Sequence, residues 1–212
     1  MRQPTREPGR GPRAERVEHT RARILVAAER LFAEHGVFNV SNRQISEAAG
    51  QGNNTAVSYH FGSKNDLVRA IIARHAAPVE EIRRRLHDRY AGSATLRDWV
   101  TCTVRPITDH LAALGSPSWY ARFAAQLMTE PTLRQLAAAE FEGVEMLHRV
   151  TERLHDCLPD LPPPVRLERD DMARTLIVHF CAERERTADP AWQSIAGGLI
   201  NAIEGLYRAP NL

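Results

Sequence analysis

Side chains that can pair with nucleic-acid bases and phosphates are concentrated in one stretch, SNRQISEAAGQGNNTAVSYHFGSKND, which runs from Ser41 to Asp66. Short hydroxyl and amide groups suit base edges, and cations and helix-terminal hydroxyls suit phosphate oxygens. The candidates for base contacts are Asn53, Asn54, Thr55, Ser58 and Tyr59. The candidates for phosphate contacts are Ser41, Arg43, His60 and Lys64.

Two short helices and a polar turn are predicted to position these side chains. Ser41 or Asn42 can cap the first helix, because a short side-chain oxygen accepts a hydrogen bond from an unpaired amide. Gly50 ends that helix, since glycine adopts the left-handed conformation without strain. Turn-forming residues follow over 51–54, so the pattern indicates a helix-turn-helix.

The second helix of this motif is expected over about residues 55–61, with Val57 and Phe61 facing inward at i, i+4 spacing. Ser63 and Asp66 then form a capping-box pattern, which is typical of the first turn of a new helix. The polar side chains between these apolar positions are left to face outward.

Two longer helices are predicted on either side of the motif. The first spans about residues 20–36, and its apolar stripe holds Ile24, Ala27, Ala28, Leu31 and Phe32. The second spans about residues 67–90. Pro78 should bend or break it, because proline lacks an amide hydrogen and clashes with the preceding turn. We therefore place a boundary between two domains near residue 76.

The rest of the chain is predicted to be a helical bundle, which makes the fold all-α. Helices are expected over residues 95–114, 119–128, 131–158, 165–186 and 192–207. The last of them is rich in small residues, which are Ala196, Gly197, Gly198, Ala202 and Gly205. Each Gly costs roughly 1 kcal/mol of helix propensity. We therefore expect close approach of another helix, from a second copy of the chain or from the same chain.

The N-terminal residues 1–19 are predicted to be a disordered basic arm, because five arginines lie among Pro and Gly with almost no apolar side chain. Through Ala76 the chain has 12 Lys and Arg against 7 Asp and Glu, and the remainder has 16 against 19. A basic front and a mildly acidic back favour a DNA-binding head on a body with another task.

The sequence indicates a cytoplasmic protein. No stretch approaches the ~20 apolar residues of a membrane span, and no signal peptide is evident. The cysteines are far apart and odd in number, which argues against a disulfide framework and for a reducing compartment. They are Cys102, Cys157 and Cys181.

Three segments together resemble the tetracycline-repressor (TetR) family of bacterial transcription regulators. They are TRARILVAAERLFAEHG (Thr20–Gly36), the stretch Ser41–Gly50, and YHFGSKNDLVRAII (Tyr59–Ile72). The resemblance implies an N-terminal three-helix DNA-binding domain over 20–76. It also implies a C-terminal helical bundle over 77–212 that binds a ligand and dimerises.

The chain departs from the family pattern in the turn and in the second helix. Family members commonly have an apolar residue at the position of Gln51 and a shorter turn, and an aromatic residue at the position of Ser58. We expect the fold to tolerate both differences. Both differences should instead change the angle at which the second helix docks on DNA.

The resemblance also implies a homodimer, in which the last two helices pair with their copies. A two-fold dimer would place its heads on successive major-groove turns of a palindromic operator, about 34–36 Å apart. The residues expected in this interface are Leu176, Phe180, Ile195, Gly198, Leu199 and Ala202.

A small apolar or amphipathic ligand is expected in the body, again from the resemblance. Aromatic side chains from two adjacent helices could wall a cavity, and the alternative is plain core packing. These side chains are Trp99, Trp119, Tyr120 and Phe123.

We therefore expect a ligand-responsive repressor that binds double-stranded DNA. A constitutive or protein-partnered regulator is the alternative, and an all-helical small-molecule or metal enzyme is remote. No GxSxG, HExxH, CxxC or P-loop pattern is present, so no catalytic residue and no cofactor is predicted. The pairs Glu145–His148 and Glu152–His155 lie about 10.5 Å apart on one predicted helix, which favours surface pairs over a metal site.

Overall fold

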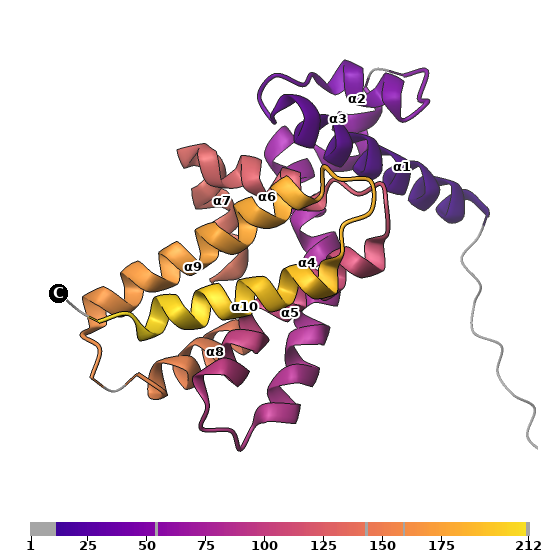
Figure 1. Cartoon of the computed structure of the whole chain (residues 1–212). Coiled ribbons are helices and arrows are strands. Elements are labelled where there is room, and N and C mark those ends of the chain that lie inside the picture. The colour runs from indigo at the N-terminus through magenta and orange to yellow at the C-terminus, as the bar shows by residue number, and fades with distance from the viewer. Residues whose placement is uncertain (1–11, 54, 143, 159, 211–212) are drawn as a thin grey trace, which may run out of the picture.

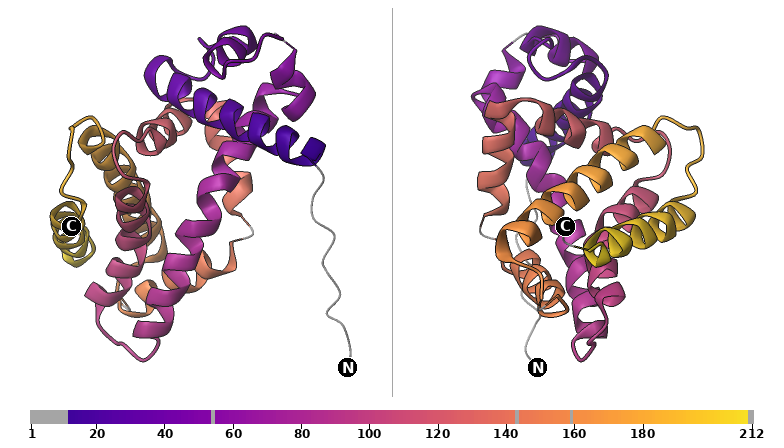
Figure 2. Two further views of the ribbon diagram at one scale, coloured as in Figure 1. Left: turned by 90° about the vertical axis from the view of Figure 1, so that its right-hand side faces the viewer. Right: turned by 60° about the vertical axis from the view of Figure 1, so that its left-hand side comes forward.

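The computed structural model describes residues 12–53, 55–142, 144–158 and 160–210, and these residues form an all-helical protein (Figure 1). The described helices are α1 (Pro12–His35), α2 (Asn42–Ala48), α3 (Ala56–Phe61), α4 (Lys64–Tyr90), α5 (Leu96–Leu114), α6 (Tyr120–Thr129), α7 (Pro131–Phe141), α8 (Glu145–Asp156), α9 (Pro163–Arg184) and α10 (Trp192–Arg208). Helices α1 to α3 form the head at one end of α4, and α5 to α10 form the body around the rest of it (Figure 2). None of the helices in the described ranges is long and apolar enough to cross a membrane.

Helix α1 begins eight residues earlier than the sequence predicts. Residues 12–19, which we expected to belong to a disordered arm, are its first two turns, and the rest of that arm lies outside the described residues. Proline suits the first turn of a helix, and Glu15 in that turn complements the helix dipole. Local helix propensity therefore orders this segment although it buries almost nothing.

One predicted helix has the wrong bounds, and of the bend or break expected at Pro78 the break is absent. The predicted helix over 131–158 is two helices, because the chain turns after Phe141, where the Val144 amide donates to the Phe141 carbonyl at 3.1 Å. Helix α4 does not end at Pro78 but continues to Tyr90. Pro78 lies on the exposed side of α4, where water can bind the carbonyl that loses its amide partner.

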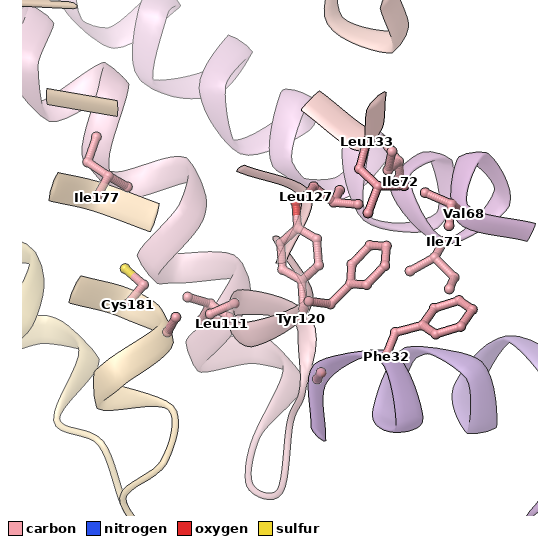
Figure 3. Packing of buried hydrophobic residues seen from close by; sticks show 14 of the residues in the cluster. Phe32, Val68, Ile71, Ile72, Leu111, Tyr120, Leu127, Leu133, Ile177 and Cys181 are labelled. Atoms are coloured by element: carbon pink, nitrogen blue, oxygen red, sulfur yellow. The ribbon is translucent and has the colours of Figure 1, made fainter. Parts of the chain in front are cut away.

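A single apolar core joins head and body. Phe32 of α1 stacks on Phe123 of α6, with ring centroids 6.3 Å apart. Ile71 of α4 lies beside Phe32, and Leu111 of α5 extends the cluster toward α9 (Figure 3). Because the head packs directly on α6, the two parts are held together by side chains as well as by α4.

A buried polar chain crosses the same junction. His75 of α4 lies 3.0 Å from the Glu29 carboxylate of α1 through Nε2, and 2.8 Å from Nε2 of His110 in α5 through Nδ1. The ring of Tyr120 in α6 stacks on His75 at 3.9 Å. Burial, and then the neighbouring His75, lowers the pKa of His110 to about 4. This chain of side chains ties α1, α4, α5 and α6 at one point.

The N-terminus of α6 is held by a second buried carboxylate, Glu185, which follows α9. It accepts hydrogen bonds from the Ala121 amide at 3.1 Å, the Arg122 amide at 3.0 Å and the Ser118 hydroxyl at 2.7 Å. Carboxylates stabilise helix N-termini because the unpaired amides there carry partial positive charge. Glu185 therefore fixes α6 to the end of α9.

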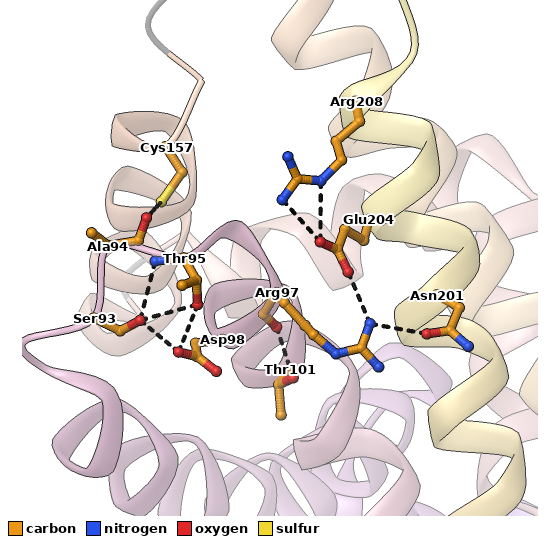
Figure 4. A network of polar contacts seen from close by, with 10 residues as sticks. All are labelled: Ser93, Ala94, Thr95, Arg97, Asp98, Thr101, Cys157, Asn201, Glu204 and Arg208. Atoms are coloured by element: carbon orange, nitrogen blue, oxygen red, sulfur yellow. Dashed lines mark hydrogen bonds and ion pairs between the residues drawn. The ribbon is translucent and has the colours of Figure 1, made fainter.

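Helix α10 is attached to the outer face of α5 by polar contacts (Figure 4). One nitrogen of Arg97 donates to Asn201 and to Glu204, at 2.9 Å each. Ser194, Gly198 and Ala202 of α10 are exposed and remain available for a different contact.

Candidate nucleic-acid interface

Helix α2 is positioned by its own capping residues. Ser41 is the N-cap, and its hydroxyl accepts from the Gln44 amide while the Gln44 side chain binds the Ser41 amide. Ile45 is fully buried, and Gly50 has a φ of 65°, as the predicted stop requires. The expected cap and stop are both confirmed.

Helix α3 has six residues and depends on the rest of the head for its orientation. Val57 and Phe61 are buried as predicted, and a helix this short is not stable alone. Its last carbonyls are satisfied in part by Arg21 of α1, whose guanidinium donates to the His60 carbonyl at 2.7 Å. The same guanidinium lies 4.2 Å above the centroid of the Phe61 ring.

The exposed face of α3 carries the predicted base-reading side chains. Tyr59 is 77% exposed, and Ser58 is exposed beside it. Asn53 and Thr55 are also exposed, and the Asn53 carbonyl oxygen accepts from the Thr55 amide at 2.9 Å and from its hydroxyl at 2.7 Å. Asn54 lies outside the described residues. The described candidates thus share one surface of the helix-turn-helix.

The four phosphate candidates are placed differently from one another. Ser41 is exposed, Arg43 is exposed and paired with Glu47 at 2.8 Å, and the ring of His60 packs edge-on to Tyr59. The ammonium of Lys64 is turned inward.

The Lys64 ammonium donates to the carbonyls of Val40 at 2.7 Å and Val37 at 3.2 Å. Burial lowers the pKa of this group. Lys64 therefore braces the link before α2, and only its third N–H is left for a phosphate.

Two residues of this surface are missing from the predicted set. Arg21 holds α3 across 39 positions of sequence, which no local pattern indicates. Asn42, weighed only as a cap, lies at the first position of α2, with its amide nitrogen 3.4 Å from the Ser58 hydroxyl. The side-chain oxygen of Asn42, Oδ1, is buried without a hydrogen-bond partner in the described structure. The sequence signal that could have identified Asn42 is a polar side chain at the first position of α2.

The four aromatic residues expected to wall one cavity are spread through the body. Trp99 is fully buried near His87 and Arg153, whereas Phe123 is fully buried against Phe32 of the head. Tyr120 belongs to the buried polar chain. The contacts of these three fit core packing, the alternative interpretation, and a ligand cavity lined by them stays a prediction. Trp119 alone is half-buried and lines a groove beside α1.

The six residues expected in the dimer interface do lie together. All of them line one open groove of about 370 Å³ between α9 and α10, which Arg184 and Ser194 complete. A side chain added at Gly198 would meet no atom within 4 Å. The glycine therefore makes no close contact within the described part of the chain.

Comparison with known proteins agrees with this geometry. The family model for bacterial regulatory proteins of the tetR family matches residues 24–71. The HTH-type transcriptional repressor AcnR of Corynebacterium glutamicum is 38% identical over 64 residues, which are 30% of this chain and 34% of that protein. The AcnR of Corynebacterium efficiens is 38% identical over 63 residues. The similarity thus spans about a third of the length of these curated relatives.

Solved structures resemble the chain over nearly its whole length. NalD, the secondary repressor of the MexAB-OprM multidrug efflux pump in Pseudomonas aeruginosa, is 25% identical with a TM-score of 0.61, covering 89% of this chain and 95% of NalD. AmtR of Mycobacterium smegmatis is 22% identical with a TM-score of 0.57, covering 95% and 90%. The likeness to AmtR shows only that the two proteins share a fold. The helix-turn-helix, the match over residues 24–71 and the whole-chain likeness to NalD together make this chain similar to the bacterial regulatory proteins of the tetR family.

Proposed function

We propose that this protein is a DNA-binding transcription repressor that recognises a palindromic operator as a homodimer. The observation that carries the proposal is the exposed face of α3, where Ser58 and the 77%-exposed Tyr59 project from a helix-turn-helix. Such a face is suited to the major groove, where hydroxyl groups can read base edges. Ser41, Arg43 and His60 surround it as phosphate contacts.

Homodimerisation through α9 and α10 is supported by the unpartnered apolar groove between them. Phe180 is 39% exposed at its edge, and Gly198 and Ala202 allow a second helix to approach closely. Because a Cβ at Gly198 would meet no atom within 4 Å in the described part of the chain, a partner helix is the better explanation of the small residues. The two heads of such a dimer would read the two halves of the operator.

Regulation by a small molecule is the finer part of the proposal. A ligand releases the repressor only to the extent that it prefers a conformation in which the heads are wrongly placed for DNA. The buried polar chain from Glu29 to His110 and the Glu185 cap of α6 would carry such a change between head and body.

A constitutive regulator is the second candidate, and one observation favours it. Phe123, one of the aromatic side chains expected to wall a ligand cavity, is fully buried against Phe32. A regulator of this kind would bind DNA with the same affinity whatever metabolite is present.

The test is binding of labelled duplexes from the region upstream of the protein's own gene, followed by fluorescence anisotropy over a range of salt concentrations. We expect tighter binding than to a scrambled duplex, and a Tyr59→Ala variant should lose that preference by about tenfold or more. A matched change on the same head, Phe38→Ala, alters an exposed side chain outside α3 and should leave the preference unchanged. Equal affinity for both duplexes would overturn the proposal.

A further inference from the structure

A second groove lies outside the proposed DNA and dimer surfaces, between α1, the end of α2 and Trp119. It measures about 370 Å³ and is open to solvent. Its lining includes His19, Arg23, Val26, Arg30, Ala49 and Trp119. We call it the α1 groove. It touches the head through α1 and α2, and the body through the segment that leads into α6.

Every ionisable side chain that lines the α1 groove is basic. Residues 19, 23, 26 and 30 follow a spacing of 4, 3 and 4, which places them on one face of α1. Neither Arg23 nor Arg30 has a hydrogen bond or an ion pair within the described parts of the chain, whereas arginines such as Arg43, Arg97 and Arg122 are paired with acids. The α1 groove thus presents two guanidinium groups whose donors are unused.

The position of Arg23 depends on the glycine that ends α2. Gly50 has a φ of 65°, and a Cβ there would collide with the Arg23 guanidinium. The absent side chain is what allows the cation to lie over the end of α2. Arg23 is therefore seated at the rim of the groove.

The middle of the α1 groove is apolar. Val26 lies between Arg23 and Arg30 in the lining and is 41% exposed. Ala27 and Ala49 form the floor, and the half-buried indole of Trp119 forms a wall. An aromatic wall over an apolar floor favours a ligand with a hydrocarbon or ring body.

We propose that the α1 groove binds a small organic carboxylate with an apolar body. The carboxylate pairs with Arg23 or Arg30, because a guanidinium binds carboxylates through two parallel hydrogen bonds. The apolar body covers Val26 and lies against Trp119. Charge complementarity excludes an organic cation, and the exposed valine disfavours a fully polar anion.

Such a ligand would bear on the head-to-body junction, an effect that rests on the proposed repressor function. Trp119 precedes Tyr120, whose ring stacks on His75, and Arg30 follows Glu29, which binds His75. A ligand that bridges Trp119 and Arg30 therefore contacts the residues next in sequence to Tyr120 and Glu29 of the buried polar chain. Binding there would bias the angle between α1 and α6.

The experiment uses octanoate as the probe and the intrinsic fluorescence of Trp119 as the signal. We expect saturable binding at about millimolar concentration, with a signal that a Trp119→Phe variant removes. A double variant, Arg23→Gln with Arg30→Gln, should bind octanoate about tenfold more weakly or worse. Its affinity for 1-octanol should change less than about twofold, because the alcohol lacks the charge.

The matched control is Arg89→Gln, since Arg89 is exposed on α4 and also has no ion pair within the described residues. It should bind octanoate as the unaltered protein does. Equal octanoate affinity in the double variant and the control, or no saturable signal up to about 10 mM, overturns the site.

DNA binding separates this inference from the proposed function. If the two arginines instead contact phosphates, the double variant lowers the salt dependence of binding to a nonspecific duplex by about 0.9 per lost contact, which overturns the carboxylate assignment. A protein that binds octanoate through both arginines and ignores DNA supports the α1 groove and overturns the repressor.

Discussion

Acidification should unfold this protein through His110, and the size of the effect follows from the structure. His110 is 5% exposed, and burial together with its neighbour His75 lowers its pKa to about 4. An unfolded histidine has a pKa of about 6.5. Between the folded and the unfolded pKa, His110 binds a proton in the unfolded chain and does not bind it in the folded chain. Stability is therefore complete above about pH 6.5 and falls as the pH drops toward 4.

The difference of about 2.5 pKa units corresponds to about 3 kcal/mol of unfolding free energy. The charged and titratable groups around the imidazole are Glu29 of α1, Arg74 and His75 of α4, and Tyr120 of α6. Glu29 raises the pKa of His110, and His75 and Arg74 lower it. Protons on both facing nitrogens, Nδ1 of His75 and Nε2 of His110, would leave two N–H groups 2.8 Å apart and would break this contact between α4 and α5.

The assay is urea unfolding of the unaltered protein and a His110→Asn variant at fixed protein concentration, from pH 4 to pH 7. Asparagine retains a donor toward His75 without titrating, so the stability advantage of the unaltered protein should shrink by about 3 kcal/mol as the pH falls from 7 to 4. Other groups titrate in both proteins and cancel in the difference. A His35→Asn variant, at a side chain that is 59% exposed, is the control. A difference between the unaltered protein and His110→Asn that stays constant with pH would refute the reasoning.

Three further predictions concern the head and the dimer. Arg21→Met should weaken binding to the preferred duplex about tenfold and leave the salt dependence of binding unchanged, because Arg21 positions α3. A salt slope smaller by about 0.9 would instead identify Arg21 as a phosphate contact. Lys64→Met should lower the unfolding free energy by about 1–2 kcal/mol, because the Val37 and Val40 carbonyls lose their donor. An unchanged unfolding free energy in urea would contradict this role. Gly198→Leu should shift sedimentation toward the monomer, whereas Gly92→Leu, in the loop after α4, should not; a Cβ at either position would meet no atom within 4 Å in the described part of the chain. A Gly198→Leu variant that remains dimeric would exclude this groove.

Features set by neighbouring residues could be predicted from the sequence. The capping box of Ser63 and Asp66, and the stops at Gly50 and Gly62, depend on backbone groups a few positions away. The inward positions of Val57 and Phe61 follow from helical periodicity in the same way.

Features set by distant contacts could not be predicted. Nothing near Glu29 in the sequence indicates that its carboxylate meets His75, 46 positions later. The Lys64 ammonium suits a phosphate by its type and position, and only the fold shows that it turns toward Val40. Periodicity likewise identifies Phe123 as buried but does not distinguish a lined cavity from a filled core.

The most direct test of the account is the stoichiometry and footprint of the protein on the duplex upstream of its own gene. We predict that two copies bind together and protect two symmetric half-sites whose centres lie about one helical turn, or 10–10.5 base pairs, apart or a multiple of that. Protection should vanish when Tyr59 and Ser58 are both replaced by alanine. A protein that stays monomeric, or that binds this duplex no better than a scrambled one at low ionic strength, would contradict the account.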